Sequence, residues 1–167
     1  MEQFLINEAK HVVIVGGGHG IGFAITNQLI NSQQCHVFAT YRDESKAQQL
    51  IKLEQANKAR LSVIKTDPTV ETEIEDLRET VSGTTDQVDL IVNCVGTLHD
   101  EQHKPEKSLR QISSQQLSHY FSVNAIVTPL IAKAFLPLLR GKRPSILCSI
   151  SAKVGSISDN RLGGWYG

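Results

Sequence analysis

The chain has 167 residues, of which 40% are hydrophobic, and its 17 basic and 17 acidic residues cancel to a formal net charge of zero. This length predicts a single domain with one hydrophobic core. The balanced charge gives no electrostatic basis for binding nucleic acid or an anionic membrane, and the continuous apolar runs are shorter than a bilayer span. The N-terminus lacks the pattern of a secretory signal, and the three widely spaced cysteines fit neither a disulfide framework nor a zinc cluster. We therefore expect a cytoplasmic protein that binds neither nucleic acid nor membranes.

Apolar, β-branched runs alternate with helical patterns along the chain. Strands are predicted over residues 11–15, 35–40, 61–66, 88–95 and 145–151. Helices are predicted over residues 20–32, 43–58, 70–81 and 113–140, the last of them broken or kinked near Pro129. Polar loops are predicted over residues 96–112 and 153–167. This alternation predicts a doubly wound, Rossmann-type parallel sheet of strand order 3-2-1-4-5 in a three-layer α/β/α arrangement.

A cluster of glycines lies between the first predicted strand and the first predicted helix. Backbone N–H groups and the positive end of the helix dipole point into such a turn, which makes it an anion site typical of a nucleotide pyrophosphate. The spacing, Gly16-x-x-x-Gly20-x-Gly22, departs from G-x-G-x-x-G, so a purely structural turn is the alternative. The residues predicted to contact a cofactor here are Gly16, Gly18, His19, Gly20, Ile21 and Gly22.

The end of the second strand bears on the choice of dinucleotide. An acidic residue at this position hydrogen-bonds the ribose 2′-hydroxyl of NAD, whereas a basic one suits the 2′-phosphate of NADP. This chain has Tyr41 followed by Arg42, and His19 adds a second basic group within the glycine turn. We therefore predict NADP as the cofactor in preference to NAD. The alternative for Arg42 is a solvated charge at a helix cap.

Four segments together resemble the short-chain dehydrogenase/reductase family. The glycine spacing resembles its T-G-x-x-x-G-I-G signature, with Val15 in place of the threonine. Residues 93–96 (NCVG) resemble its N-N-A-G motif, and residues 121–124 (FSVN) resemble its F-x-V-N. Residues 146–151 resemble its fifth strand, which ends in a catalytic serine. Segments 98–109, 155–160 and 163–166 resemble a narrower group, the bacterial C-factor-like proteins.

The resemblance implies roles for further residues. Asp67 would contact the adenine amino group, Asn93 would brace the end of the fourth strand, and Gly96 would lie against the cofactor. Asn124 would hold a water molecule in a proton relay. Ser151 would hydrogen-bond the substrate carbonyl or hydroxyl, with Ser149, on the same face of the strand, as its rival.

The family's catalytic acid is a tyrosine followed four residues later by a lysine, and this sequence contains no such pair. In the subgroup pattern the catalytic tyrosine would come directly after Gly167, which makes Tyr166 its neighbour rather than the acid itself. We therefore expect a C-terminally truncated chain. Residues 1–167 would form a single NAD(P)-binding domain that is incomplete at its C-terminus.

The sequence as a whole predicts an NADP-preferring oxidoreductase that transfers a hydride between the nicotinamide and a small carbonyl or secondary alcohol. The alternative is a dinucleotide-binding regulatory or signalling protein without turnover. The apolar stripe of the long helix belongs to the core or to the helical face of a homodimer or homotetramer. His99 and His103 have a spacing that could hold zinc on a helix, but they lack a third ligand, so no metal site is predicted. His11, His36 and His119 are predicted to be ordinary surface or edge residues.

Overall fold

A five-stranded parallel sheet forms the centre of the computed structural model, which describes residues 9–99, 104, 106, 108–152 and 158. Its strands are β1 (His11–Val15), β2 (His36–Tyr41), β3 (Leu61–Lys65), β4 (Leu90–Asn93) and β5 (Ile146–Ser149). They are ordered β3-β2-β1-β4-β5, and every neighbouring pair is parallel. The predicted strand order and fold class are confirmed. Tyr166, His103 and most of segment 153–167 lie outside the described residues.

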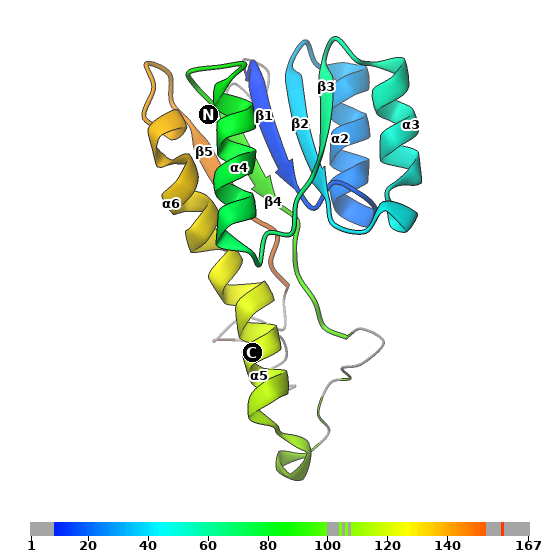
Figure 1. The fold of residues 1–167 in the computed structure, drawn as a ribbon, viewed down its shortest axis with the longest axis vertical. Coiled ribbons are helices and arrows are strands. Elements are labelled where there is room, and N and C mark those ends of the chain that lie inside the picture. Colours follow the sequence, from blue (N-terminus) through cyan, green and yellow to red (C-terminus); the bar gives the residue numbers. More distant parts are fainter. Residues whose placement is uncertain (1–8, 100–103, 105, 107, 153–157, 159–167) are drawn as a thin grey trace.

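Helices cover both faces of this sheet (Figure 1). They are α2 (Gly20–Ser32), α3 (Gln48–Ala56), α4 (Glu71–Ser82), α5 (Ser114–Phe121) and α6 (Val127–Leu139), with 3-10 turns at Glu44–Lys46 and Leu109–Gln111. Helices α2 and α3 lie on one face, and α4 and α6 lie on the other. Figure 1 shows α5 extending beyond the carboxyl ends of the strands, on the side where the glycine turn lies.

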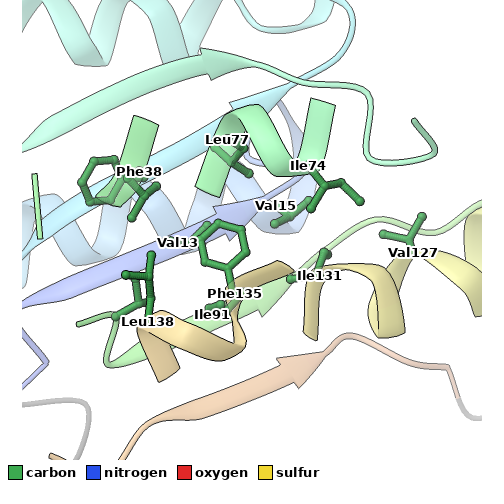
Figure 2. Close-up of a cluster of buried hydrophobic side chains, with 12 residues drawn as sticks. Val13, Val15, Phe38, Ile74, Leu77, Ile91, Val127, Ile131, Phe135 and Leu138 are labelled. Carbon is green, nitrogen blue, oxygen red and sulfur yellow. The ribbon is translucent and has the colours of Figure 1, made fainter. Parts of the chain in front are cut away.

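The larger core cluster lies between the sheet and the α4–α6 pair (Figure 2). Alternate residues of β1 point into it, because side chains of a strand project to opposite faces in turn. Val13 and Val15 of β1 meet Ile131 and Phe135 of α6, and all four are fully buried. The opposite face holds Val12 and Ile14 of β1 in a second cluster with α2 and α3. Burial on both faces explains the continuous apolar sequence of β1.

The long helix after the polar loop is interrupted earlier than the sequence predicts. A π-helical turn occupies Ser122–Ile126, and α6 begins at Val127, so Pro129 lies in the first turn of α6. Proline cannot donate to the carbonyl four residues before it, and its ring crowds that carbonyl. For Pro129 this carbonyl belongs to Ala125, which is in the π turn. The widened turn accommodates the proline without breaking the helix.

One helical stretch, Ser114–Leu139, is long and apolar enough by length and composition to cross a membrane. Its second half, α6, packs four side chains into the core, namely Val127, Ile131, Phe135 and Leu138. The core helix of an α/β domain has this arrangement. Length and composition alone do not decide whether this stretch contacts a membrane, so the absence of membrane binding stays a prediction.

Candidate functional site

The glycine turn is fastened to the end of β2. The Gly16 N–H donates to the Thr40 hydroxyl at 3.0 Å, and the Gly17 N–H donates to the Thr40 carbonyl at 2.7 Å. Gly16 has a φ of 85°, a conformation that side chains with a Cβ rarely adopt. A Cβ on Gly22 would overlap the Gly16 carbonyl oxygen. These two glycines are therefore required by the backbone path itself, which brings the turn close against the first turn of α2.

The amino end of α2 opens toward this turn. His19 is its N-cap residue with an extended backbone, and its side chain makes no capping hydrogen bond within the described part of the chain. Gly20, Ile21 and Gly22 form the first helical positions, where backbone N–H groups have no partner within the helix. Ile21 is 60% exposed. This end of α2 thus presents N–H donors and a positive dipole to an anion.

A cavity of about 890 Å³ lies along the carboxyl ends of the strands. Of the predicted cofactor-binding residues, Gly16, Gly18, His19, Tyr41, Arg42 and Gly96 line it. The other lining residues are Thr40, Asp43, Lys46, Thr66, Pro68, Thr69, Cys94, Val95, Thr97, His99, His119 and Val123. The walls therefore come from the turns after β1, β2, β3 and β4 and from the α5 region. A topological switch point of an open parallel sheet has this placement, because strand order reverses beside β1.

Two basic side chains line the cavity next to the end of β2. Arg42 follows β2 directly, and Lys46 ends the 3-10 turn Glu44–Lys46. The Lys46 ammonium lies 3.8 Å from the Asp43 carboxylate. Hydrogen bonds from the Ser45 hydroxyl and N–H lower the pKa of the Asp43 carboxyl, so that group is ionised at neutral pH. Arg42 and Lys46 make this part of the wall suited to an anionic group.

Asn93 connects three elements at the end of β4. It is 1% exposed, and its side-chain oxygen accepts from the Val95 N–H at 3.0 Å. Its side-chain N–H group donates to the Thr128 hydroxyl at 3.0 Å and to the Ser149 hydroxyl at 3.2 Å. The Thr128 and Ser149 hydroxyls are themselves 3.2 Å apart. The Asn93 side chain thus joins the end of β4 to α6 and β5, and Asn93 does not line the cavity. A contact between Asn93 and a cofactor stays a prediction.

Asn124 fixes the loop that follows β4. Its side-chain oxygen accepts from the Thr97 N–H at 2.8 Å, and its side-chain nitrogen donates to the Thr97 carbonyl at 2.9 Å. Both contacts come from the π turn, which places Asn124 beside the loop. Its side chain therefore holds the segment in which Gly96 and Thr97 line the cavity. A role in a water relay stays a prediction.

The predicted residues Gly20, Ile21, Gly22 and Asn124 are not among the lining residues of the cavity, and two further predicted residues also stand apart from its wall. Among the described residues, Asp67 and Ser151 are not part of the lining. The Asp67 carboxylate accepts from the Thr69 N–H and hydroxyl, at 3.0 and 2.6 Å, and so closes a tight turn. Ser151 is exposed and lies two residues beyond the end of β5. Ser149, its rival, is engaged with Asn93 and Thr128. The roles of Asp67 and Ser151 stay predictions.

Cys94 lines the cavity as a neutral thiol. Burial, with a smaller contribution from the nearby Cys148, raises its pKa to about 11. At neutral pH the thiolate, which is the nucleophilic form, is therefore scarce. Cys94 contributes an apolar surface to the wall rather than a reactive group.

Sequence reasoning missed five charged or titratable residues of the wall, namely Asp43, Lys46, Cys94, His99 and His119. Lys46 was placed within a polar helix, and its position four residues after Arg42 was the available signal. His119 was predicted to be an ordinary surface residue, yet it lines the cavity from α5. No local motif marks His119, because its place in the wall depends on how α5 packs. Within the described residues no group of three or more potential metal ligands occurs, and the absence of a metal stays a prediction.

The sheet order, the glycine turn and the cavity at the strand ends define an α/β protein of the Rossmann type. Comparison with protein families narrows this class. The family model described as short chain dehydrogenase matches residues 10–163. The chain belongs to the short-chain dehydrogenase family, which confirms the family resemblance predicted from the sequence.

Individual relatives agree with this assignment. The chain is 30% identical over 156 residues to the short chain dehydrogenase gsfK of Penicillium aethiopicum, covering 88% of this chain and 58% of that protein. It is 30% identical over 152 residues to the L-fucose dehydrogenase of Mus musculus, covering 91% of this chain and 52% of that protein. The chain thus spans little more than half the length of these relatives. The crystal structure of NADPH-bound carbonyl reductase from chicken fatty liver has a similar fold, with a TM-score of 0.81 and 24% identity over 92% of this chain and 64% of that chain.

Proposed function

We propose that this chain is an NADP-preferring short-chain oxidoreductase that transfers a hydride between the nicotinamide and a carbonyl or secondary alcohol. The observation that carries the proposal is the cavity of about 890 Å³ beside the glycine turn, with Arg42 and Lys46 in its wall. The NADPH bound to the related carbonyl reductase fold supports the choice of cofactor. Assignment to the bacterial C-factor-like group remains part of this proposal.

The residues present fit a dinucleotide. A Cβ on Gly22 would overlap the Gly16 carbonyl, so the turn packs as tightly as a pyrophosphate cradle requires. The N–H groups at the start of α2 would donate to the pyrophosphate, and the Arg42 guanidinium would pair with the 2′-phosphate. A bound nicotinamide dinucleotide supplies or accepts the hydride.

The remaining roles concern orientation and proton transfer. Asn93 and Asn124 hold the strand end and the loop that face the cofactor, through Val95 and Thr97. We assign Ser151 to hydrogen bonding with the substrate oxygen and Asn124 to a water-mediated proton path, both as proposals based on the family motif. Asp67 is proposed to contact the adenine amino group. The substrate is a small carbonyl or alcohol whose identity these residues do not select.

Fluorescence titration tests the cofactor assignment. NADPH should bind more tightly than NADH, and Arg42→Gln should weaken NADPH far more than NADH, since NADH lacks the phosphate that arginine would contact. Equal losses for both dinucleotides would refute the role of Arg42. If neither dinucleotide binds, the proposed function is wrong.

Turnover is tested separately by following NADPH oxidation over a panel of aldehydes, ketones and quinones. Oxidation of NADPH with any substrate of the panel supports the oxidoreductase. Tight NADPH binding without turnover across the panel favours the regulatory dinucleotide-binding protein instead.

We also propose a cytoplasmic protein that forms a homodimer or homotetramer. Exposed apolar side chains on α5 and α6 support association, because Leu117 is 44%, Phe121 is 59% and Leu136 is 42% exposed. Light scattering coupled to gel filtration measures the mass. A monomer at micromolar concentration would contradict the proposed assembly.

A further inference from the structure

The turn that follows β2 has a fixed position against the glycine turn. The Asp43 carboxylate accepts from the Ser45 N–H at 2.9 Å and from the Ser45 hydroxyl at 2.6 Å, which closes the 3-10 turn Glu44–Lys46. Ala47 directly follows and is fully buried. Its Cβ lies 3.5 Å from where a Cβ on Gly18 would stand. The backbone of Lys46 is therefore held next to the glycine turn.

The Lys46 ammonium is only loosely held in this position. Its distance of 3.8 Å from the Asp43 carboxylate exceeds a hydrogen bond, and the two side chains are 65% and 47% exposed. Such exposed pairs contribute little to stability. Lys46 lines the cavity together with Arg42 and Asp43, and its ammonium donors remain available to a stronger acceptor.

We propose that Lys46 is a second specificity-determining cation, which donates to the cofactor 2′-phosphate beside Arg42 in competition with its loose pair to Asp43. This inference rests on the proposed NADP preference. A phosphate group carries more negative charge than the Asp43 carboxylate and offers three acceptor oxygens. Arginine supplies a planar fork to such a group, and lysine adds a mobile point charge. NADH offers Lys46 only a neutral hydroxyl.

Fluorescence titration with NADPH and NADH tests the role of Lys46. Lys46→Gln should weaken NADPH binding about five-fold at low salt, which is typical of one exposed charge contact, and should leave NADH within about two-fold. Lys52→Gln is the matched control, because Lys52 is an exposed lysine of α3 outside the cavity lining and its loss changes the net charge equally. Lys46→Arg should retain most of the NADPH affinity. The effect of Lys46→Gln should shrink in 0.5 M NaCl, since salt screens exposed charges (a Debye length of about 4 Å).

Asp43→Asn gives an independent readout of the same pair. Removing the carboxylate should tighten NADPH two- to three-fold by releasing Lys46, and this gain should vanish in the double variant with Lys46→Gln (about the size of one exposed pair). Thermal unfolding of each variant checks that the turn is still folded.

Several outcomes would overturn the inference. Equal losses in Lys46→Gln and Lys52→Gln would show only the effect of net charge. Equal losses for NADPH and NADH would show only a damaged turn. If Arg42→Gln weakens NADPH selectively and Lys46→Gln does not, the inference fails while the proposed function stands. If the unaltered protein shows no preference for NADPH, both fail together.

Discussion

At the amino end of the sheet, Asp89 is 5% exposed and accepts hydrogen bonds from the N–H groups of Lys10 and His11 and from the Arg143 guanidinium, at 2.8 to 3.0 Å. Gln87 next to it is 4% exposed and contacts the Arg143 backbone. At the carboxyl end of the same sheet, Asn93 forms a comparable network with Thr128 and Ser149, whereas the basic residues Arg42 and Lys46 line a cavity. Polar groups that pair with one another hold the fold together, whereas polar groups that line a cavity are accessible to a ligand.

At the carboxyl end of the sheet, the largest loss of stability is expected from a substitution of Gly22. Gly22→Ala should cost about 3 kcal/mol of unfolding free energy, because the added Cβ must displace the Gly16 carbonyl backbone. Nucleotide binding should fail in whatever fraction remains folded. Urea denaturation measures the loss. Gly83→Ala is the control, since its Cβ would meet only ordinary contacts from 3.4 Å outward. Equal stability of the two variants would contradict the close packing of the turn.

At the amino end of the sheet, a substitution of Asp89 should lower the stability of the fold without changing cofactor binding in the cavity. Asp89→Asn should cost about 2 kcal/mol, because a buried carboxylate with several donors loses its charge and one set of acceptors. NADPH affinity of the folded protein should be unchanged. Asp86→Asn, an exposed neighbour, should change stability by less than about 0.5 kcal/mol. A loss of cofactor affinity in Asp89→Asn would show that the two ends are coupled.

Arg60 provides a further polar contact that stabilises the fold at the amino end of the sheet. Its guanidinium donates to the Gln33 carbonyl at 2.7 Å and to the Ile30 carbonyl at 2.9 Å, which caps the end of α2. Arg60→Met should cost about 1 kcal/mol, because two terminal carbonyls lose a charged donor. Arg78→Met, which removes only an exposed pair with Glu79, should cost less than about 0.5 kcal/mol. Thermal unfolding distinguishes the two variants, and equal costs would argue against the cap.

His11 gives the smallest expected effect, which depends on pH. Burial is the main cause that lowers its pKa, and Arg143 and Lys10 add to it against the opposing charges of Asp89 and Asp86. The folded state therefore binds the His11 proton less readily than the unfolded chain does, so its contribution is present above about pH 6.5 and is lost as the pH falls. His11→Asn should flatten this acid loss by less than about 1 kcal/mol. Urea denaturation between pH 7.5 and 5.5 measures it, with His99→Asn as the exposed control. An unchanged pH dependence in His11→Asn would assign the acid loss to other groups.

The sequence predicted β1 and α2 with their observed ends, because a doubly buried strand, a glycine turn and an amphipathic helix all leave local signals. The fourth strand is shorter than its apolar run, since Val88 and Val95 are apolar for packing and lie outside the ladder. The 3-10 turn at Glu44–Lys46 was hidden in a polar helical pattern. Local composition cannot separate these cases, because burial and strand pairing depend on distant partners.

The residues of the candidate site also fall into those with local sequence signals and those whose position depends on distant partners. Motif and spacing predicted cofactor contacts for Gly16, Gly18 and Arg42, which line the cavity, and the contacts themselves stay predictions. The contacts that Asn93 makes with Thr128 and Ser149 join residues 35 and 56 positions apart, and no local pattern predicts such partners. Lys46 and His119 enter the wall through the path of a turn and the packing of a helix. Motifs thus locate the backbone cradle, whereas the side-chain walls require the fold.

The π turn at Ser122–Ile126 joins α5 to α6 and sets the rotation of one helix relative to the other about their common axis. Within it, Asn124 must face Thr97, and after it, Val127 and Ile131 must face the sheet. Successive residues of an α-helix advance by about 100°, so deleting one residue here would rotate the two halves by roughly that angle. Either the loop at the cavity or the core would then lose its contacts. The chain length of this segment is therefore under a stricter constraint than its composition.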